Sequence, residues 1–290
     1  MRSLSIAMRI IVLVSVLLLV PAVPVAGAAI ARDAIVHPTS ADAVVLRVTT
    51  GGGFVAPQTN LRLLPSFTLY GDGTVIVPGV VRQIFPGPAI SPLLRRHLSE
   101  SRMQALLRRA RAAGLLAGGP VDYGDMSAVG ISDAPTTTLL LNAAGRHVTR
   151  SAYALGAGRG GGRMSPRQMR ARAALAHFVA ALPSGPGGSP YAPRAIAVYV
   201  APATGQPPAG AGRVAWPLKR DLATAGTKVS NGLGYRCIAV RGKDATTLLA
   251  RLRAADERSR WFARGRPART YEVIARPLLP DEPGCPAATP

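Results

Sequence analysis

Residues 10–31 form the only long uncharged apolar run in this 290-residue chain, and the run lies at its N-terminal end. Each span of a multi-span membrane protein needs about 20 apolar residues, so one run excludes that class. The chain is 48% hydrophobic and can bury a core, which also excludes a wholly disordered polycation. The sequence therefore predicts a globular body behind an N-terminal apolar segment.

The N-terminal segment has the three zones of a secretory signal peptide. Arg2 and Arg9 precede the apolar run, and small residues follow it. We expect a signal peptide over residues 1–28, cleaved after Ala28, and a protein that is secreted or associated with the cell wall. The alternative is an uncleaved N-terminal membrane anchor formed by residues 10–31.

The chain has two cysteines, Cys237 and Cys285. An even count in an exported protein favours a disulfide bond. The bond would close a loop of 48 residues, worth about 4 kcal/mol in the chain-entropy model. With no Cys-x-x-Cys and no histidine nearby in sequence, we interpret the pair as a structural cross-link of a small domain.

The apolar pattern after the signal peptide divides the chain in two. Residues 29–42 read as a tether and 183–193 as a Pro/Gly linker, because both are poor in core-forming residues. They bound an expected domain at 43–182 and a smaller one at 194–290. Both domains alternate strand and helix patterns, which predicts an α+β class with antiparallel hairpins and packed helices.

The expected elements are short. The patterns predict strands at 43–50, 66–70, 74–77, 136–141, 147–155, 195–200, 236–241 and 270–275. Helices are expected after Ser99 or Ser101, from 165 to 182, and from 244 to 255. The glycines of 71–73 and the segment 142–145 are expected to form hairpin turns.

Several segments resemble an uncharacterised family of actinobacterial secreted proteins. They are VLRVTTGGGFV (45–55), LLPSFTLYGDGTVIVPG (63–79), ISDAPTTTLLL (131–141), SAYALG (151–156), Trp216-Pro217 and RPLLPDEPGC (276–285). Residues 43–182 also resemble a domain of unknown function found in exported bacterial proteins. These resemblances imply export and imply no reaction.

The only acidic concentration is Asp122, Asp125 and Asp133. Carboxylates spaced along an extracellular loop could bind Ca²⁺, which takes six to eight oxygen ligands. Their spacing does not match an EF-hand, and such residues equally form turns by bonding their own backbone. They remain metal-ligand candidates beside that structural interpretation.

Motifs for catalysis and cofactors are missing. There is no Gly-x-Ser-x-Gly and no His-Glu-x-x-His, and the glycines of 156–161 read as a flexible loop rather than a dinucleotide site. We expect no cofactor and no catalytic residue. A hydrolase assembled at the domain interface stays open, and a perturbed carboxylate beside His97 or His147 would favour it.

Charge is the strongest remaining signal. The chain carries 35 Lys+Arg, all but three of them arginine, against 14 Asp+Glu, for a net charge of +21. Removal of residues 1–28 leaves +19. Basic groups concentrate in three expected helical regions: Arg95, Arg96, Arg102, Arg108, Arg109 and Arg111; Arg163, Arg167, Arg170 and Arg172; and Arg251, Arg253, Arg258 and Arg260.

Such a surface attracts polyanions in a salt-dependent way. Outside a cell these are anionic cell-wall polymers or lipid head groups. Aromatic residues make up only 5% and do not interleave with the basic runs, so sequence-specific nucleic acid binding is not expected. The leading hypothesis is a non-catalytic exported protein held loosely at the cell envelope. The alternatives are the interface hydrolase and a secreted inhibitor or ligand-binding protein with a loop held by the disulfide.

Overall fold

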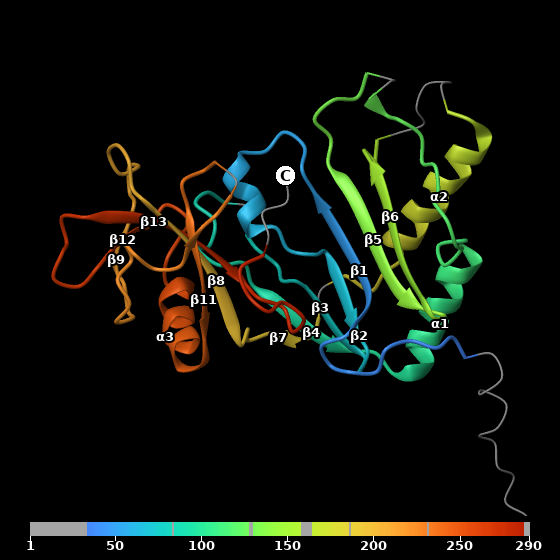
Figure 1. Ribbon diagram of the computed structural model, residues 1–290, viewed down its shortest axis with the longest axis horizontal. Helices are drawn as coiled ribbons and strands as arrows, with labels where there is room; N and C mark the ends of the chain where they lie inside the picture. The colour runs from blue at the N-terminus through green and yellow to red at the C-terminus, as the bar shows by residue number, and fades with distance from the viewer. Residues whose placement is uncertain are drawn as a thin grey trace, which may run out of the picture. The chain divides into compact units, whose positions relative to one another are not determined.

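The computed structural model describes residues 34–82, 84–127, 130–157, 164–185, 187–230 and 232–286. The expected signal peptide, the first part of the tether and the glycine-rich stretch 158–163 lie outside these residues. Ile35–Pro290 form one compact unit. The described residues of this unit form two sheets and three α-helices, which confirms the α+β class (Figure 1).

The first sheet has seven antiparallel strands in the order β6-β5-β1-β2-β3-β4-β7. Its strands are β1 (Val44–Gly51), β2 (Phe67–Tyr70), β3 (Thr74–Pro78), β4 (Leu93–His97), β5 (Thr136–Ala143), β6 (Arg146–Tyr153) and β7 (Ser189–Pro190). The six longer strands lie within the expected domain 43–182. The sheet is built mainly from hairpins, as the sequence predicts.

Both expected hairpin turns are present, and each depends on backbone with positive φ. Gly73 has φ 84° between β2 and β3, where the Asp72 carboxylate accepts from the Thr74 amide at 2.8 Å. Ala144 and Gly145, with φ 55° and 67°, connect β5 to β6. Two successive residues of positive φ match the twist of antiparallel strands, which fixes the register of this hairpin.

Helices α1 (Glu100–Ala112) and α2 (Pro166–Ala180) pack on one face of the first sheet (Figure 1). Ser99 precedes α1, as expected, and Ser165 caps α2. The Gln168 amide donates to Ser165 Oγ at 3.2 Å, and the Ser165 amide donates to Gln168 Oε1 at 2.8 Å. This reciprocal capping satisfies two amides that the helix itself leaves unpaired.

The second sheet has six strands in the order β10-β11-β8-β13-β12-β9. They are β8 (Ala195–Pro202), β9 (Arg213–Ala215), β10 (Thr227–Lys228), β11 (Arg236–Arg241), β12 (Arg260–Phe262) and β13 (Thr270–Pro277). The sheet is mixed because β9 runs parallel to β12. Helix α3 (Gly242–Arg253) packs on one face over the buried Trp216 and Trp261, whose rings meet edge to face at 5.9 Å.

The C-terminal segment, residues 278–286, connects the two sheets. Arg47 of β1 donates to Asp281 Oδ1 at 2.6 Å, and the Tyr70 hydroxyl donates to the same oxygen at 2.8 Å. Burial beside Asp281 raises the pKa of Tyr70. Arg276 of β13 holds Glu282 with two bonds of 2.7 Å. Opposite charges brought together inside the fold therefore fix this segment to both sheets.

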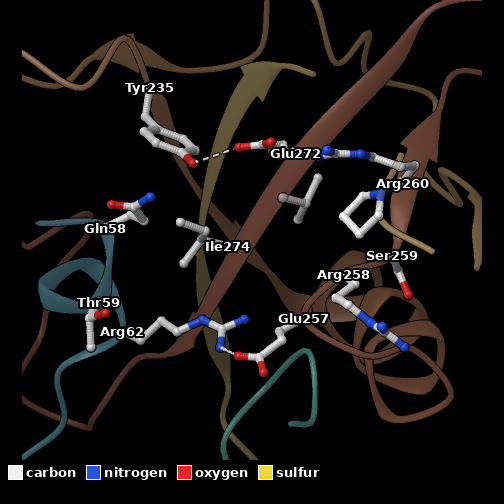
Figure 2. Close-up of a pocket in the computed structure, with 12 residues that line it drawn as sticks. Gln58, Thr59, Arg62, Tyr235, Glu257, Arg258, Ser259, Arg260, Glu272 and Ile274 are labelled. Atoms are coloured by element: carbon white, nitrogen blue, oxygen red, sulfur yellow. Dashed lines mark hydrogen bonds and ion pairs between the residues drawn. The ribbon is translucent and has the colours of Figure 1, made fainter. Parts of the chain in front are cut away.

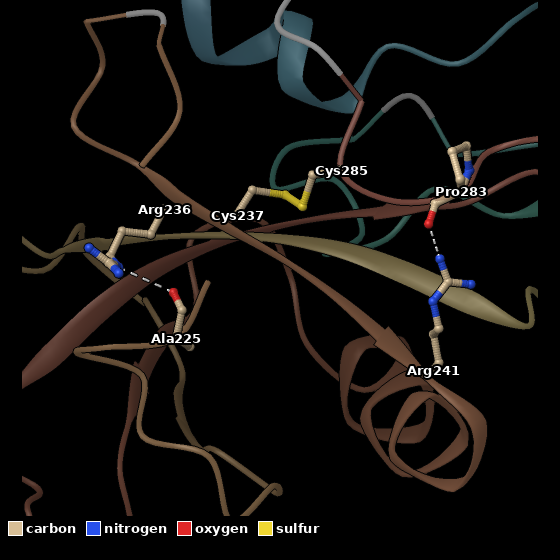
Figure 3. Close-up of a disulfide and its surroundings, with 6 residues drawn as sticks. All are labelled: Ala225, Arg236, Cys237, Arg241, Pro283 and Cys285. Atoms are coloured by element: carbon tan, nitrogen blue, oxygen red, sulfur yellow. Dashed lines mark hydrogen bonds between the residues drawn. A yellow bond between two sulfur atoms is a disulfide. The ribbon is translucent and has the colours of Figure 1, made fainter. Parts of the chain in front are cut away.

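The expected disulfide is confirmed. Cys237 of β11 is bonded to Cys285, with a Cα–Cα distance of 6.1 Å (Figure 3). Figure 3 also shows Arg241 donating to the Pro283 carbonyl. The bond closes the 48-residue loop and holds the C-terminal segment beside β11.

Two regions differ from the expected organisation. Residues 93–97 form strand β4, so Arg95 and Arg96 lie on a strand and not on a helix. The segment 183–193, expected as a linker, contributes β7, in which Ser189 pairs with Arg95. Part of that segment is thus the edge strand of the first sheet.

Two arginines assigned to the basic surface are buried. Arg172 donates to the carbonyls of Tyr123, Tyr153 and Ala154 at 2.6–3.2 Å, and Arg260 faces Glu272. Burial lowers the pKa of Arg172. The interpretation of these two residues as surface cations was wrong, because their guanidinium groups donate hydrogen bonds to carbonyl and carboxylate groups inside the protein.

Candidate functional site

A pocket of about 260 Å³ lies where helix η1 (Pro57–Arg62) meets the second sheet (Figure 2). Its charged side chains come from η1, from the loop between α3 and β12, and from β12 and β13. They are Arg62, Glu257, Arg258, Arg260 and Glu272, with Tyr235 beside them. Residues distant in sequence thus converge on one small volume.

The two carboxylates of this pocket each face a guanidinium. Arg62 Nη1 donates to Glu257 Oε2 at 2.8 Å, and Arg260 Nη1 donates to Glu272 Oε1 at 2.6 Å. The register of β12 and β13, with Trp261 opposite Tyr271, explains why Arg260 lies beside Glu272. Each carboxylate is therefore held in place by an arginine of the same pocket.

Tyr235 belongs to the same network. Its hydroxyl donates to Glu272 Oε2 at 3.0 Å (Figure 2). Burial and the neighbouring Glu272 carboxylate raise the pKa of Tyr235 to about 12. The phenol therefore stays protonated at neutral pH. On this side of the pocket the Tyr235 hydroxyl and the Arg260 guanidinium both donate to Glu272, so the three side chains hold one another in place.

Arg258 adds a positive charge without a carboxylate. Its Nη1 donates to the Ala209 carbonyl at 2.9 Å, and its guanidinium lies over the Phe85 ring at 5.2 Å. Its Nε is buried and has no hydrogen-bond partner among the described atoms. Three guanidinium groups against two carboxylates leave the pocket with an excess of positive charge.

A larger cleft of about 640 Å³ lies between β4, β7 and the C-terminal segment. Arg95, Arg194 and Arg241 line it, and their side chains are exposed. Alternation along β4 places Arg95 on the same side as the buried Leu93. The carboxylates of Asp42, Asp72 and Glu282 also line this cleft, so its charge is balanced and its preference for anions is weaker.

The three aspartates considered as metal ligands do not come together in the structure, and two of them accept hydrogen bonds from nearby backbone amides. Asp122 accepts from the Gly124 amide at 2.8 Å, and Asp125 accepts from the Ser127 amide at 2.9 Å. Asp133 has φ 55°, and its carbonyl accepts from Phe54. Within the described residues, no three His, Cys, Asp or Glu side chains gather as metal ligands would.

The two histidines of interest for catalysis lie outside the pockets. His97 is exposed at the end of β4, where its ring packs against Gly73. His147 contacts Asn142 at 2.5 Å beside an exposed hairpin turn. Neither side chain lines the pocket of Figure 2, the larger cleft beside β4 and β7, or the two smaller pockets lined by Ile90 and by Arg47. The carboxylate–histidine cleft that would favour a hydrolase is not formed by these residues.

The disulfide holds an internal segment. Leu278 and Leu279 are buried, and Asp281 and Glu282 are ion-paired with the two sheets. An inhibitor would instead need an exposed rigid loop at this position. The sequence identified the cysteines but could not reveal the pocket of Figure 2, whose residues are joined only by the fold.

Comparison with protein-family models, curated proteins and solved structures found no match for this chain. In the part of the chain that the structure describes, no helix is long and apolar enough to cross a membrane. The disulfide is of the kind that persists in oxidising compartments.

Proposed function

We propose that this chain is an exported, non-catalytic protein that associates with the cell envelope by attraction between its basic surface and anionic wall polymers or lipid head groups. The observation that carries the proposal is the composition of the outer helix faces. All three helices expose arginines there and supply almost no acidic residues to oppose them.

The exposed helical arginines have no ion pair among the described residues. They are Arg102, Arg108 and Arg109 on α1, Arg167 and Arg170 on α2, and Arg251 and Arg253 on α3. Solvent-exposed helices often pair such cations with acids three or four residues away. Here α2 contains no acidic residue and α1 contains only Glu100, which bonds Gln104 and His37.

Four acidic side chains are instead engaged in ion pairs away from the helices. Glu257, Glu272, Asp281 and Glu282 each pair with an arginine at 2.6–2.8 Å. Their charges cancel locally, so they do not offset the helical arginines. A polyanion approaching the helices therefore meets an excess of positive charge, whose attraction falls as salt rises.

Export is supported by two features. The N-terminal sequence has the zones of a signal peptide, and the Cys237–Cys285 bond fits an oxidising exterior. An envelope of anionic polymers is the first surface that an exported cation encounters.

The test is sedimentation of residues 29–290 with isolated cell walls across a salt series. We expect binding that weakens steadily with salt. In the variant R108Q/R109Q/R251Q/R253Q, the slope of log affinity against log salt falls by up to about 3, since each neutralised phosphate contributes about 0.7–0.9.

The matched control replaces the same four arginines by lysine, which keeps the charge. It should bind like the wild type. Absence of binding at low salt, or equal salt slopes for the glutamine variant and the wild type, would contradict the proposal.

A further inference from the structure

Exposed large apolar side chains gather in two loops. Phe54 is 91% exposed, Val80 80%, Phe85 76% and Ile84 63%, and Val55 and Val81 accompany them. Val36 and Met169 are the other exposed large apolar residues among those described, and they lie elsewhere in the sequence. Gathered apolar exposure on a protein surface marks an interaction site.

The loop between β3 and β4, described over residues 79–82 and 84–87, is held by hydrogen bonds at Gly79 and at Gly87. The Gly79 amide donates to the Pro92 carbonyl at 2.8 Å beside the end of β3. The Gly87 amide donates to Glu257 Oε1 at 2.7 Å, and the Glu257 amide donates back to the Gly87 carbonyl at 3.0 Å. Residues 89–90 are already buried in the core of the second sheet. The apolar side chains therefore project from a loop with anchored ends.

The backbone of the loop 52–56 directs the Phe54 side chain into solvent. Gly52 and Gly53 have φ 77° and 83°, which turn the chain after β1. The Phe54 amide donates to the Asp133 carbonyl at 2.9 Å, so the backbone is fixed while the ring is exposed. A Cβ at Gly53 would lie 2.8 Å from that same carbonyl, so this close approach requires glycine.

The Glu257 carboxylate forms hydrogen bonds near both loops. Its Oε1 accepts from Gly87 at the end of one loop, and its Oε2 pairs with Arg62. Arg62 ends helix η1, which begins at Pro57, immediately after the loop 52–56. Glu257 therefore links the end of the loop 79–87 to the helix that follows the loop 52–56.

Positive charge lies beside the apolar side chains of the loop 79–87. Asp72 is the only acidic residue in 43–99. Arg82 is exposed within the loop 79–87, and Arg258 lies over the Phe85 ring at 5.2 Å. Apolar tips beside arginines are suited to a bilayer surface, where the tips enter the acyl boundary and the guanidinium groups remain among anionic head groups.

We propose that the exposed apolar side chains of these two loops, at positions 54, 55, 80, 81, 84 and 85, insert into the surface of a bilayer that contains anionic lipids. This inference rests on the proposed envelope association and assigns a lipid surface as its partner. Charge attracts the protein to the surface, and apolar insertion retains it there.

The first test uses residues 29–290, which lack the N-terminal apolar run, and places a tryptophan reporter at a described position of the loop between β3 and β4. In the Ile84→Trp variant we expect a blue shift of tryptophan emission on adding phosphatidylglycerol/phosphatidylcholine vesicles. Trp216 and Trp261 are buried, so their emission stays constant. Vesicles of phosphatidylcholine alone should produce little shift, because attraction by charge is then missing.

The second test removes the apolar tips. V80S/I84S should reduce the partition coefficient for anionic vesicles about tenfold or more, since two large apolar side chains no longer leave water. V36S/M169S is the matched control, with two exposed apolar residues changed outside the loops, and it should partition like the wild type. Equal melting temperatures of the two variants would show that both are folded.

The outcomes separate this inference from the proposed function. Unchanged partition of V80S/I84S, or an equal blue shift with phosphatidylcholine vesicles, overturns the inference. Sedimentation with cell walls but no binding to anionic vesicles also overturns it, and leaves the proposed function in place. Binding to neither target overturns both.

Discussion

Replacing Cys237 and Cys285 by alanine removes the covalent closure of a 48-residue loop that includes α3 and three strands of the second sheet. The C-terminal segment keeps its other attachments, since Asp281 still pairs with Arg47 and Glu282 with Arg276. The native fold should therefore persist, and the substitution should act mainly on the unfolded chain.

The expected cost follows from loop length. In the chain-entropy model, a 48-residue loop reduces the entropy of the unfolded chain by an amount worth about 4 kcal/mol at 25 °C. For a unit of this size, each kcal/mol lowers the melting temperature by roughly 2–4 °C, so a fall of roughly 8–16 °C is expected.

Guanidinium denaturation measures the effect directly. Trp216 and Trp261 are buried, and their fluorescence reports exposure of the second core on unfolding. Wild type with the bond reduced by dithiothreitol is the control for the alanine substitutions. A loss below about 1 kcal/mol in both samples would refute the entropic account.

Two further predictions concern buried charge and ionisation. Asp281→Asn leaves Arg47 half-buried without its carboxylate and should lower the free energy of unfolding by about 2–3 kcal/mol, somewhat less than for a fully buried pair, as measured in urea. The pKa of Tyr235 is raised to about 12 from an unfolded value near 10. Because the folded state then holds its proton longer, the stability that this group contributes is complete below pH 10 and is lost as pH rises towards 12. Tyr235→Phe should lose stability less steeply over that range in circular-dichroism melts, and an unchanged slope would contradict the assignment.

Local signals were sufficient for the long hairpins and helices. The turn at Ala144 and Gly145 lies between two alternating runs, and Ser165 with Gln168 forms a capping pair three residues apart. Such features are set by residues close in sequence, so their patterns are readable without the fold.

Short edge strands could not be predicted in the same way. Ser189–Pro190 becomes β7 only because Leu94 and Arg95 offer unpaired backbone beside it. Arg213–Ala215 becomes β9 by pairing in parallel with β12. Two or three residues have no periodicity, so these strands depend on partners that the fold supplies.

Buried arginines were missed for a related reason. Arg150 donates to the carbonyls of Leu115, Ala117 and Gly119, which belong to the turn after α1. No sequence pattern near Arg150 predicts that these three carbonyl groups will accept its hydrogen bonds. The pocket of Figure 2 likewise brings η1 together with β12 and β13, about 200 residues later in the chain. The sequence shows that these charged residues exist, but it does not show that they line one pocket.

The position of the C-terminal segment has a consequence for the order in which the chain matures. Arg47 and Tyr70 meet their acidic partner only when Asp281 arrives, more than 200 residues later. Until then the side of the first sheet that packs against Leu279 is uncovered, and Cys237 has no disulfide partner. These contacts between the two sheets and the disulfide can therefore form only after residues 278–286 have joined the fold, which makes them a late, long-range step of folding.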